Sequence, residues 1–464
     1  MTNSEVTNYQ IFKREGGFAL PSIIFLITIL TMVAGSALSI VYLRKQISLR
    51  EIARVKASYA AESGIVRLLH QYGDSLADET QVADFSEDDG SQSHVNIGRW
   101  GALEIVRSMG SYQNMTIERT ALAAQIPPPE LDKALVFANS SHQLVFTGAS
   151  RIVGDIVVGQ PGTSIGELKN YPSPIVVPVK GSIDRRKIPE LPAFNPNPIK
   201  KEIEHYLDLL AERGKRGSES NRVMDSSANG SNNYNIGRVQ DSTDYIYFSQ
   251  NTILKDTISR RGKPLHILVN GTATLSKSIR LSGLVVVIAS HMITVEQGAE
   301  IDETILFSQD SVELESGAQV TCQIIAPSIR FDANSVAGYP SILYSCCCGL
   351  SDTTRQRITI GPHAKVEGTV ALFSPRSIPQ TSDNLILISL GATVTGAVYS
   401  TGGVTLDGSV IGIVMTRDFY FYDPPTTYLG WLRSADIERN LLSPEFLLLP
   451  EFGNQRIYAI LDWI

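Results

Sequence analysis

The sequence is poor in cysteine, and its few cysteines do not form a disulfide framework. Among 464 residues there are four cysteines, three of them consecutive. Neighbouring cysteines rarely reach disulfide geometry, and a zinc site needs spaced thiols or nearby histidines. Because free cysteine packs as a small hydrophobe, we interpret these residues as buried or incidental. They are Cys322, Cys346, Cys347 and Cys348.

The chain also lacks an excess of positive charge. It has 40 Lys and Arg against 47 Asp and Glu, a net charge of -7. Nucleic-acid binding needs concentrated cations to neutralise phosphates, and no basic face is apparent after the first 60 or so residues. The composition therefore argues against a general nucleic-acid partner.

Motifs of several large enzyme classes are missing as well. The sequence contains no phosphate-binding loop, no H-E-x-x-H and no C-x-x-C pair. We predict a protein that is not an enzyme and has no cofactor or metal. An alternative is a surface carbohydrate-active β-helix enzyme using acidic residues, of which the candidates are Asp302, Glu303, Asp310 and Asp332.

Charge is absent from Gly16 to Leu43, about 28 positions, and about 20 residues are enough for a helix to cross a bilayer. A cleaved secretory signal would have a shorter apolar core of roughly 7 to 15 residues. Here a helical apolar rhythm continues beyond Leu43, and no proline occurs from Ser22 to Gln125. The pattern predicts one transmembrane and amphipathic helix over 18–72.

The beginning of the chain resembles a known family. A polar leader ending in basic residues and glycine precedes Phe18, a long apolar helix and the run A-A-E-S-G at Ala60–Gly64. These features resemble type IV pilin-like proteins, especially minor pilins and pseudopilins. The resemblance implies a leader over 1–17 and a prepilin peptidase that cuts between Gly17 and Phe18 and methylates the new terminus. We assign to the filament and membrane helix Phe18, Ser22, Ile27, Leu30, Val41, Leu43 and Glu62.

One position departs from the family pattern. Major pilins carry glutamate at the fifth mature position, where it pairs with a neighbouring subunit's terminal amine, and that position is Ser22 here. A buried amine without a carboxylate is costly. The departure implies a minor, tip or initiating subunit. The alternative is a plain single-pass anchor, and the cations after Leu43 outnumber Lys13 and Arg14, which opposes the pilin orientation.

The residues after the helix predict a small pilin-like β region over 73–126. Its beginning, 73–90, is polar and acidic and predicts a solvated loop. Alternating patterns on either side of S-Y-Q-N predict a β-hairpin. The consecutive prolines Pro127 to Pro129 predict a Pro-rich linker over 127–134, a stiff spacer into another domain.

From residue 135 the chain repeats a short pattern: alternating apolar residues, a turn, then a second short apolar run. Repetition at about 17 to 28 residues predicts a β-solenoid over 135–425, in which a single coil cannot bury its own core. The motif resembles bactofilin-like polymer-forming β-helices, and an ordinary β-sandwich is the alternative. The predicted corners are Gly298, Gly317, His363, Gly391 and Gly408.

Two segments interrupt or follow the repeats. An insertion over 196–240 contains an amphipathic helix with Ile203, Leu207 and Leu210 on one side. Residues 426–464 are rich in aromatics and leucine, and we expect them to cap the open end of the solenoid. A contact patch for a partner is the alternative use of these aromatics.

Together these features predict a mainly β protein with a pilin-like helix, a small β head and a β-solenoid. We expect a non-catalytic structural subunit of a type IV pilus or a type II secretion-like filament. Its expected location is the bacterial inner membrane, single-pass, with the C-terminal part periplasmic or extracellular. The expected partners are the membrane, other pilin-like subunits, the prepilin peptidase and further copies of the chain. The alternative is an unprocessed, membrane-anchored solenoid that self-associates.

Overall fold

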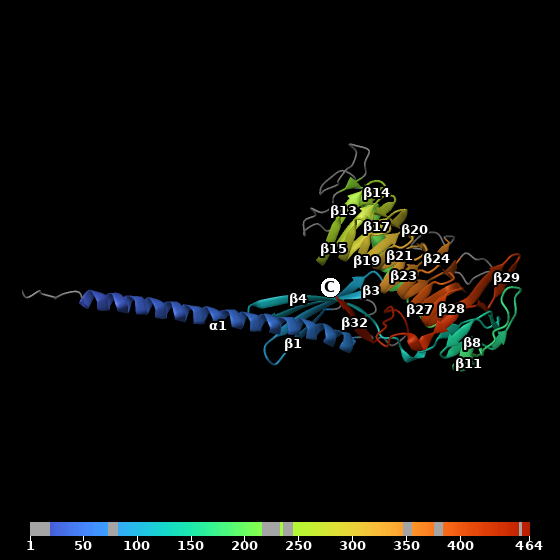
Figure 1. Cartoon of the computed structure of the whole chain (residues 1–464), viewed down its shortest axis with the longest axis horizontal. Coiled ribbons are helices and arrows are strands. Elements are labelled where there is room, and N and C mark those ends of the chain that lie inside the picture. Colours follow the sequence, from blue (N-terminus) through green and yellow to red (C-terminus); the bar gives the residue numbers. More distant parts are fainter. Residues whose placement is uncertain are drawn as a thin grey trace, which may run out of the picture.

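The computed structural model describes residues 19–72, 82–215, 233–234, 245–346, 355–374, 384–453 and 457–464. One long helix precedes an antiparallel five-stranded sheet, here called the head sheet, and a parallel β-solenoid (Figure 1). The predicted fold class is therefore confirmed: a mainly β chain with a long N-terminal helix, a small β head and a solenoid.

Helix α1 runs without interruption from Ala19 to Tyr72, 54 residues. Its only proline, Pro21, lies in the first turn, where a missing N–H costs no helical hydrogen bond. The side chains from Leu20 to Ile52 are exposed, whereas from Ala53 onward one stripe is buried. The first part of α1 projects beyond the rest of the molecule (Figure 1).

The head sheet has the order β1-β2-β3-β4-β32, with antiparallel neighbours throughout. The predicted hairpin is present, because β3 and β4 pair across a tight turn at Gln113. Residues 82–86 correct the sequence prediction: they form the edge strand β1 instead of a loop. The strands are β1 Val82–Ser86, β2 Gln92–Trp100, β3 Leu103–Tyr112, β4 Met115–Gln125 and β32 Tyr458–Trp463.

The solenoid is built from short parallel strands, and from β12 to β25 each strand pairs with the strand two further along the chain. This spacing gives stacked coils. The strands are β5 Leu135–Phe137, β6 Leu144–Thr147, β7 Arg151–Val153, β8 Ile156–Gly159, β9 Thr163–Ile165, β10 Val179–Lys180, β11 Ile183–Arg186, β12 Asn233–Tyr234, β13 Tyr245–Phe248, β14 Thr252–Leu254, β15 Thr257–Val269, β16 Ala273–Leu275, β17 Arg280–Ala289, β18 Met292–Val295, β19 Glu300–Ser308, β20 Ser311–Leu314, β21 Gln319–Ile325, β22 Ser328–Phe331, β23 Val336–Ser345, β24 Gln356–Ile360, β25 Lys365–Leu372, β26 Asn384–Ile388, β27 Thr393–Leu406, β28 Ser409–Asp423, β29 Thr426–Leu429, β30 Trp431–Arg433 and β31 Asp436–Glu438.

Alternate residues of these strands fill the interior of the solenoid. In one column, β-branched residues of five successive coils lie directly over one another and are fully buried. Each coil therefore completes the burial of the next, which is why the coils fold only as a stack. The column consists of Ile293, Val312, Ile329, Ile358 and Ile386.

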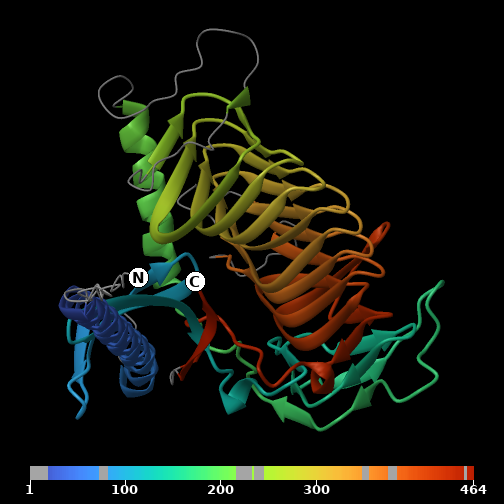
Figure 2. The same cartoon turned by 60° about the vertical axis from the view of Figure 1, so that its left-hand side comes forward.

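The order of coils in space differs from their order in the sequence. Strand β5 pairs with β28 of the last coil, while β10 and β11 pair with β7 and β8. The chain thus builds one end of the stack first, crosses to the opposite end, and returns coil by coil (Figure 2). The crossing contains α2, Asn197–Lys215, so the amphipathic helix predicted in the insertion is present. Other parts of 196–240 lie outside the described residues.

A second apolar core lies outside the solenoid, between one of its faces and the head. Helix α2 lies along this face (Figure 2), and its Ile203 and Tyr206 pack with Phe307 of β19 and Trp100 of the head. Of the helical residues predicted to share a face, Ile203 and Leu210 are buried and Leu207 is partly buried. The outward apolar residues of the solenoid are thereby covered.

The C-terminal residues correct the expectation of a solenoid cap over 426–464. Strands β29 to β31 join the solenoid, but the last strand, β32, pairs with β4 in the head sheet. The free edge of β4 offers unpaired backbone groups, and strand pairing satisfies them. The solenoid is therefore inserted between the fourth and fifth strands of the head. Residues 127–134 are not a spacer either, because Leu131 and Ala134 are buried in the cores.

Candidate functional site

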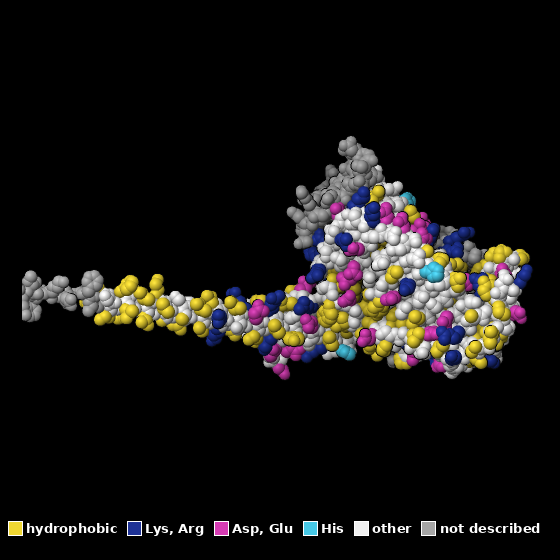
Figure 3. Space-filling model, viewed as in Figure 1, with side chains coloured by type: hydrophobic (Ala, Val, Ile, Leu, Met, Phe, Trp, Pro, Cys, Tyr) yellow, Lys and Arg dark blue, Asp and Glu magenta, His cyan; other side chains and the backbone are white. Residues whose placement is uncertain are grey.

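The exposed part of α1 is the first candidate site. Among the described residues, one helical span, Leu20–Gln71 within α1, is long and apolar enough to cross a membrane, with a mean hydropathy of 2.4 in its most apolar window and none of that window buried. Figure 3 shows apolar side chains along the free part of α1, with charged residues concentrated nearer the head. Such a surface needs a lipid or protein environment.

The residues assigned from the sequence to the filament and membrane helix divide into two groups. Most lie on the exposed part of α1: Ser22, Ile27, Leu30, Val41 and Leu43. Glu62 instead lies where α1 contacts the head, and its carboxylate is 3.2 Å from Arg119 Nε. Gly17 and Phe18 lie outside the described residues.

The A-A-E-S-G run positions α1 on the head. Ala60, Ala61 and Gly64 face the sheet, and both alanines are buried. The contact at Gly64 is so close that a Cβ there would lie 2.5 Å from Ser93 Oγ of β2. Gly110 of β3 lies still closer to the helix, since a Cβ there would lie 2.0 Å from the backbone oxygen of Ala57. Small residues on both elements let the helix approach the strands at short distance.

Ion pairs flank this contact. Lys56 Nζ lies 2.9 Å from Asp89 and an Arg67 nitrogen lies 2.9 Å from Glu87, both pairs linking α1 to the β1–β2 connection. Hydrogen bonding from Ser91 and Lys56 lowers the pKa of Asp89. Exposed pairs contribute little individually, so packing of the small residues holds the helix while these pairs favour one orientation.

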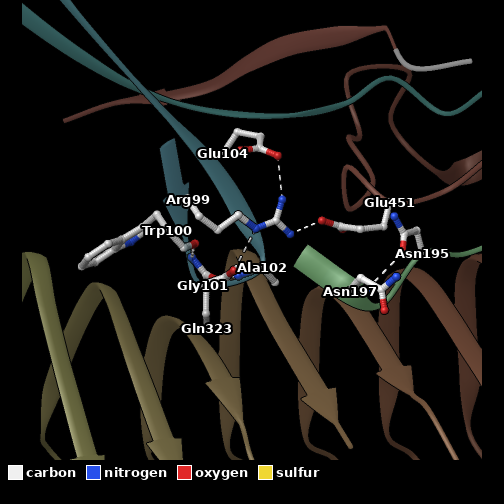
Figure 4. Close-up of polar contacts among 9 residues, drawn as sticks. All are labelled: Arg99, Trp100, Gly101, Ala102, Glu104, Asn195, Asn197, Gln323 and Glu451. Atoms are coloured by element: carbon white, nitrogen blue, oxygen red, sulfur yellow. Dashed lines mark hydrogen bonds and ion pairs between the residues drawn. The ribbon is translucent and has the colours of Figure 1, made fainter. Parts of the chain in front are cut away.

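A second site, which we call the joint, connects the head to the solenoid. It contains Arg99, Trp100, Gly101, Ala102, Glu104, Gln323 and Glu451. The Arg99 guanidinium lies between two carboxylates, 2.6 Å from Glu104 and in direct contact with Glu451 (Figure 4). The Glu451 side chain is fully buried. A buried charge is stable only when paired, so the cation fixes the 442–453 region against the head.

The pKa values in the joint reflect burial opposed by charge. Burial lowers the pKa of Arg99, but Glu451 and Glu104 outweigh it, and Arg99 is cationic. Burial raises the pKa of Glu451 to about 7, although Arg99 opposes this rise. The contact with the Arg99 guanidinium favours the carboxylate form of Glu451.

The β2–β3 turn also binds the solenoid through Gln323. The side-chain oxygen of Gln323 accepts a hydrogen bond from Ala102 N at 2.7 Å, and its nitrogen donates to Trp100 O at 3.0 Å. Gly101 adopts φ +61°, and a Cβ there would lie 2.4 Å from Gln323 Oε1. Only glycine fits both the left-handed backbone and this close approach. No local sequence pattern indicates this site, because Gln323 and Glu451 are far from Arg99 along the chain.

The predicted solenoid corners lie at turns between strands. Gly298, Gly317, His363 and Gly391 have positive φ values, whereas Gly408 does not. At Gly408 the limiting factor is space, because a Cβ would lie 2.4 Å from Ala392 O.

The acidic candidates for carbohydrate chemistry are not brought into one cleft. Asp302 and Glu303 lie on β19 near Asp462, whereas Asp310 precedes β20 and Asp332 is paired with Arg330 at 2.9 Å. Neither of two hollows on the described surface is lined by any of these four.

Among the described residues, the other candidate catalytic and metal-binding side chains are not grouped into a site either. The run Gly162–Gly166 reads G-T-S-I-G, but Ser164 lies within strand β9 and not in the strand-to-helix turn that a nucleophile elbow needs. Among the described residues, no group of three or more His, Cys, Asp or Glu side chains is arranged to hold a metal ion. Cys322 is buried, which raises its pKa, and Cys346 is partly buried; Cys347 and Cys348 lie outside the described residues.

Comparison with known proteins finds a likeness to a solved pilin structure. No protein-family model and no curated protein matches the chain. The chain is similar to the competence-associated pilin ComZ from Thermus thermophilus, at 11% identity over 89% of this chain and 97% of that chain, with a TM-score of 0.21. A TM-score this low supports no inference about the function of this chain.

Proposed function

We propose that the chain is a non-catalytic, minor pilin-like structural subunit of a type IV pilus or type II secretion-like filament. The observation that carries the proposal is the division of α1. Residues 20–52, which are uncharged as far as Leu43, are exposed, and the following turns pack against an antiparallel sheet through small residues. An exposed apolar helix joined to a compact head can lie in a bilayer and then pack with the corresponding helices of similar subunits.

The proposed topology places the free part of α1 in the bacterial inner membrane and the solenoid outside the cytoplasm. The exposed segment, residues 20–52, is longer than the roughly 20 residues that a membrane-spanning helix needs. The cations that follow Leu43 oppose this orientation by the positive-inside rule. The predicted leader over 1–17 and the large β domain that follows the helix favour the proposed orientation.

The N-terminus of the native protein tests the processing step. We expect protein from native membranes to begin at a methylated Phe18. A Gly17→Leu variant is expected to retain residues 1–17, whereas a matched Gly16→Ala variant is expected to be cut normally. Edman sequencing and intact-mass measurement identify the first residue of each variant. If Gly17→Leu began at the same residue as the wild type, the pilin assignment would be wrong.

The same experiment separates the proposal from its main alternative. An unprocessed, self-associating anchored solenoid would begin at Met1 in every variant.

For the enzyme alternative, the measurement is release of reducing ends from a broad panel of glycans. We expect none from the wild type, and cleavage that is lost in Asp302→Asn would favour the enzyme.

The absence of glutamate at residue 22 supports a minor or terminal position in the filament. Without that carboxylate, the terminal amine of a neighbouring subunit would be buried unpaired, at a cost of several kcal/mol, about 3–5. A subunit at the tip has no further subunit to pair on that side. Immunogold labelling of sheared filaments is expected to place the protein at one end.

A further inference from the structure

At one end of the solenoid, the last strands have unpaired outer edges among the described residues. Strand β9 pairs only with β6, β10 only with β7 and β11 only with β8, and no other described strand continues from their outer edges. We call these three strands and the following residues to Lys187 the open end. Figure 2 shows this end of the coil stack away from α1, beyond the last returning coil.

The core columns of the solenoid stop at this end without a cover. Phe146 is succeeded in register by Ile165, Ile152 by Val179, and Ile156 by Ile183. The first member of each pair is at most 1% exposed, whereas Ile165 is 54% and Ile183 40% exposed. A further coil would bury these side chains, and the chain supplies none in the described residues.

Apolar exposure continues in the adjoining loop. Ile175 is 101% exposed, Val176 66% and Val177 71%. This loop lines one side of a hollow of ≈ 650 Å³ whose other side is formed by Gly148 to Arg151. The hollow is large enough for an apolar side chain from a bound segment.

The last segment of the open end carries an excess of positive charge. Residues 180–187 carry Lys180, Arg185, Arg186 and Lys187 against one acid, Asp184, in a chain whose net charge is -7. Arg186 is paired with Asp184 at 2.9 Å. Among the described residues, the other three cations have no ion-pair partner. The charge therefore favours an acidic occupant.

The same charge disfavours a second copy of the chain bound through this end. Two such ends facing each other would bring four cations against four, and like charges placed opposite one another destabilise strand pairing. Cations on an edge strand are also a common protection against self-association. A partner of opposite charge avoids this repulsion.

We propose that the open end binds an extended acidic segment of another polypeptide, which adds a strand to β11 and places alternate apolar side chains over Ile183 and its neighbours. Backbone pairing supplies affinity and the cationic rim selects acidic side chains, as in other strand-addition complexes. This inference does not rest on the proposed function, because peptide binding and N-terminal processing are measured independently.

The test uses full-length protein in detergent and fluorescein-labelled ten-residue peptides. The probe alternates valine and glutamate, and the controls alternate valine and lysine or carry N-methyl groups on the backbone of the acidic probe. Fluorescence anisotropy measures the dissociation constant. We expect the acidic probe to bind at least about tenfold more tightly than either control, because one control reverses the charge and the other cannot pair as a strand.

Matched charge reversals locate the binding. R185E/K187E is expected to weaken binding of the acidic probe at least about tenfold, and R357E/K365E, at exposed positions of β24 and β25, is expected to leave it unchanged. Circular dichroism melting verifies that both variants fold. No binding at about 1 mM, equal binding of the N-methylated probe, or equal loss in both variants would overturn the proposal. A dimer abolished by R185E/K187E in sedimentation would overturn it in favour of a second copy.

Discussion

Single glycines determine how closely the helix and the head approach each other. A Cβ on Gly110 would lie 2.0 Å from the carbonyl oxygen of Ala57 and 2.4 Å from the nitrogen of Ala61. These are backbone atoms of α1 that cannot rotate away. The glycine is required by the neighbouring helix, since its φ is not in the left-handed region.

Gly110→Ala is therefore expected to destabilise the head by about 1–3 kcal/mol, the usual cost of overpacking. Guanidinium unfolding of the full-length protein in detergent measures the change. Gly35→Ala is the matched control, because nothing lies within 4 Å of that position and alanine is the better helix former. Equal stability of Gly110→Ala and Gly35→Ala would contradict the close contact.

Glu303 makes stability depend on pH. Burial, together with the neighbouring Asp462 and Asp302, raises its pKa from 4.5 to about 7. The folded state then binds this proton more tightly than the unfolded state, so the free energy of unfolding decreases as pH rises from about 4.5 to 7. Glu303→Gln removes this contribution.

We expect the melting temperature of the wild type to decrease from pH 5 to pH 8 by more than that of Glu303→Gln. Differential scanning fluorimetry at both pH values measures the two decreases. Glu367→Gln, at an exposed position of β25, is the control and is expected to follow the wild type. Identical pH dependence in Glu303→Gln and the wild type would show that Glu303 does not hold its proton in the folded state.

At the scale of elements, the joint depends on one cation. Removing Arg99 leaves two carboxylates, Glu104 and Glu451, in a site where their side chains are 9% and 0% exposed. Breaking a buried pair in this way costs about 3–5 kcal/mol, because the remaining charge is uncompensated. The loss is expected to be smaller at pH 5, where Glu451 can take up a proton.

Arg99→Met tests this dependence. Its free energy of unfolding at pH 8 is expected to fall by about 3–5 kcal/mol, and hydrogen exchange in β32 is expected to accelerate. Arg357→Met, which removes an exposed cation, is expected to change stability by less than about 0.5 kcal/mol. If the two variants were equally stable, the joint would not be held by the ion pairs.

Local pattern predicted many of the elements but not how they connect. The uninterrupted apolar run predicted α1, the alternation around S-Y-Q-N predicted the β3–β4 hairpin, and the repeats predicted the solenoid, because each depends on neighbouring residues. Strand β32 and the Arg99–Glu451 pair depend on residues several hundred positions apart. The sequence carries no local signal for such pairing. The acidic composition of 73–90 was misleading at 82–86, because an edge strand tolerates charged side chains.

At the scale of the whole molecule, the insertion of the solenoid within the head sheet links the two mechanically. The chain leaves the head after β4 and returns as β32 beside it, so both ends of the insertion are anchored in one sheet. The same sheet packs on α1 through Ile65, Leu68 and Leu69. Force or displacement applied to α1 is therefore transmitted to the solenoid without a flexible linker in the described residues.

The proposed membrane topology also predicts which half of α1 would contact the bilayer. A lysine near the middle of a spanning helix costs about 2.5–3.5 kcal/mol, whereas a lysine beyond the interface costs little. Leu30 lies in the uncharged run and is 63% exposed, while Leu49 lies among the cations after it and is 52% exposed. We expect Leu30→Lys to reduce the fraction of protein that resists carbonate extraction from membranes, and Leu49→Lys to leave it unchanged. Because both substitutions replace an exposed leucine on the same helix, equal losses would indicate that α1 is held by protein contacts along its whole length rather than by a bilayer around its first half.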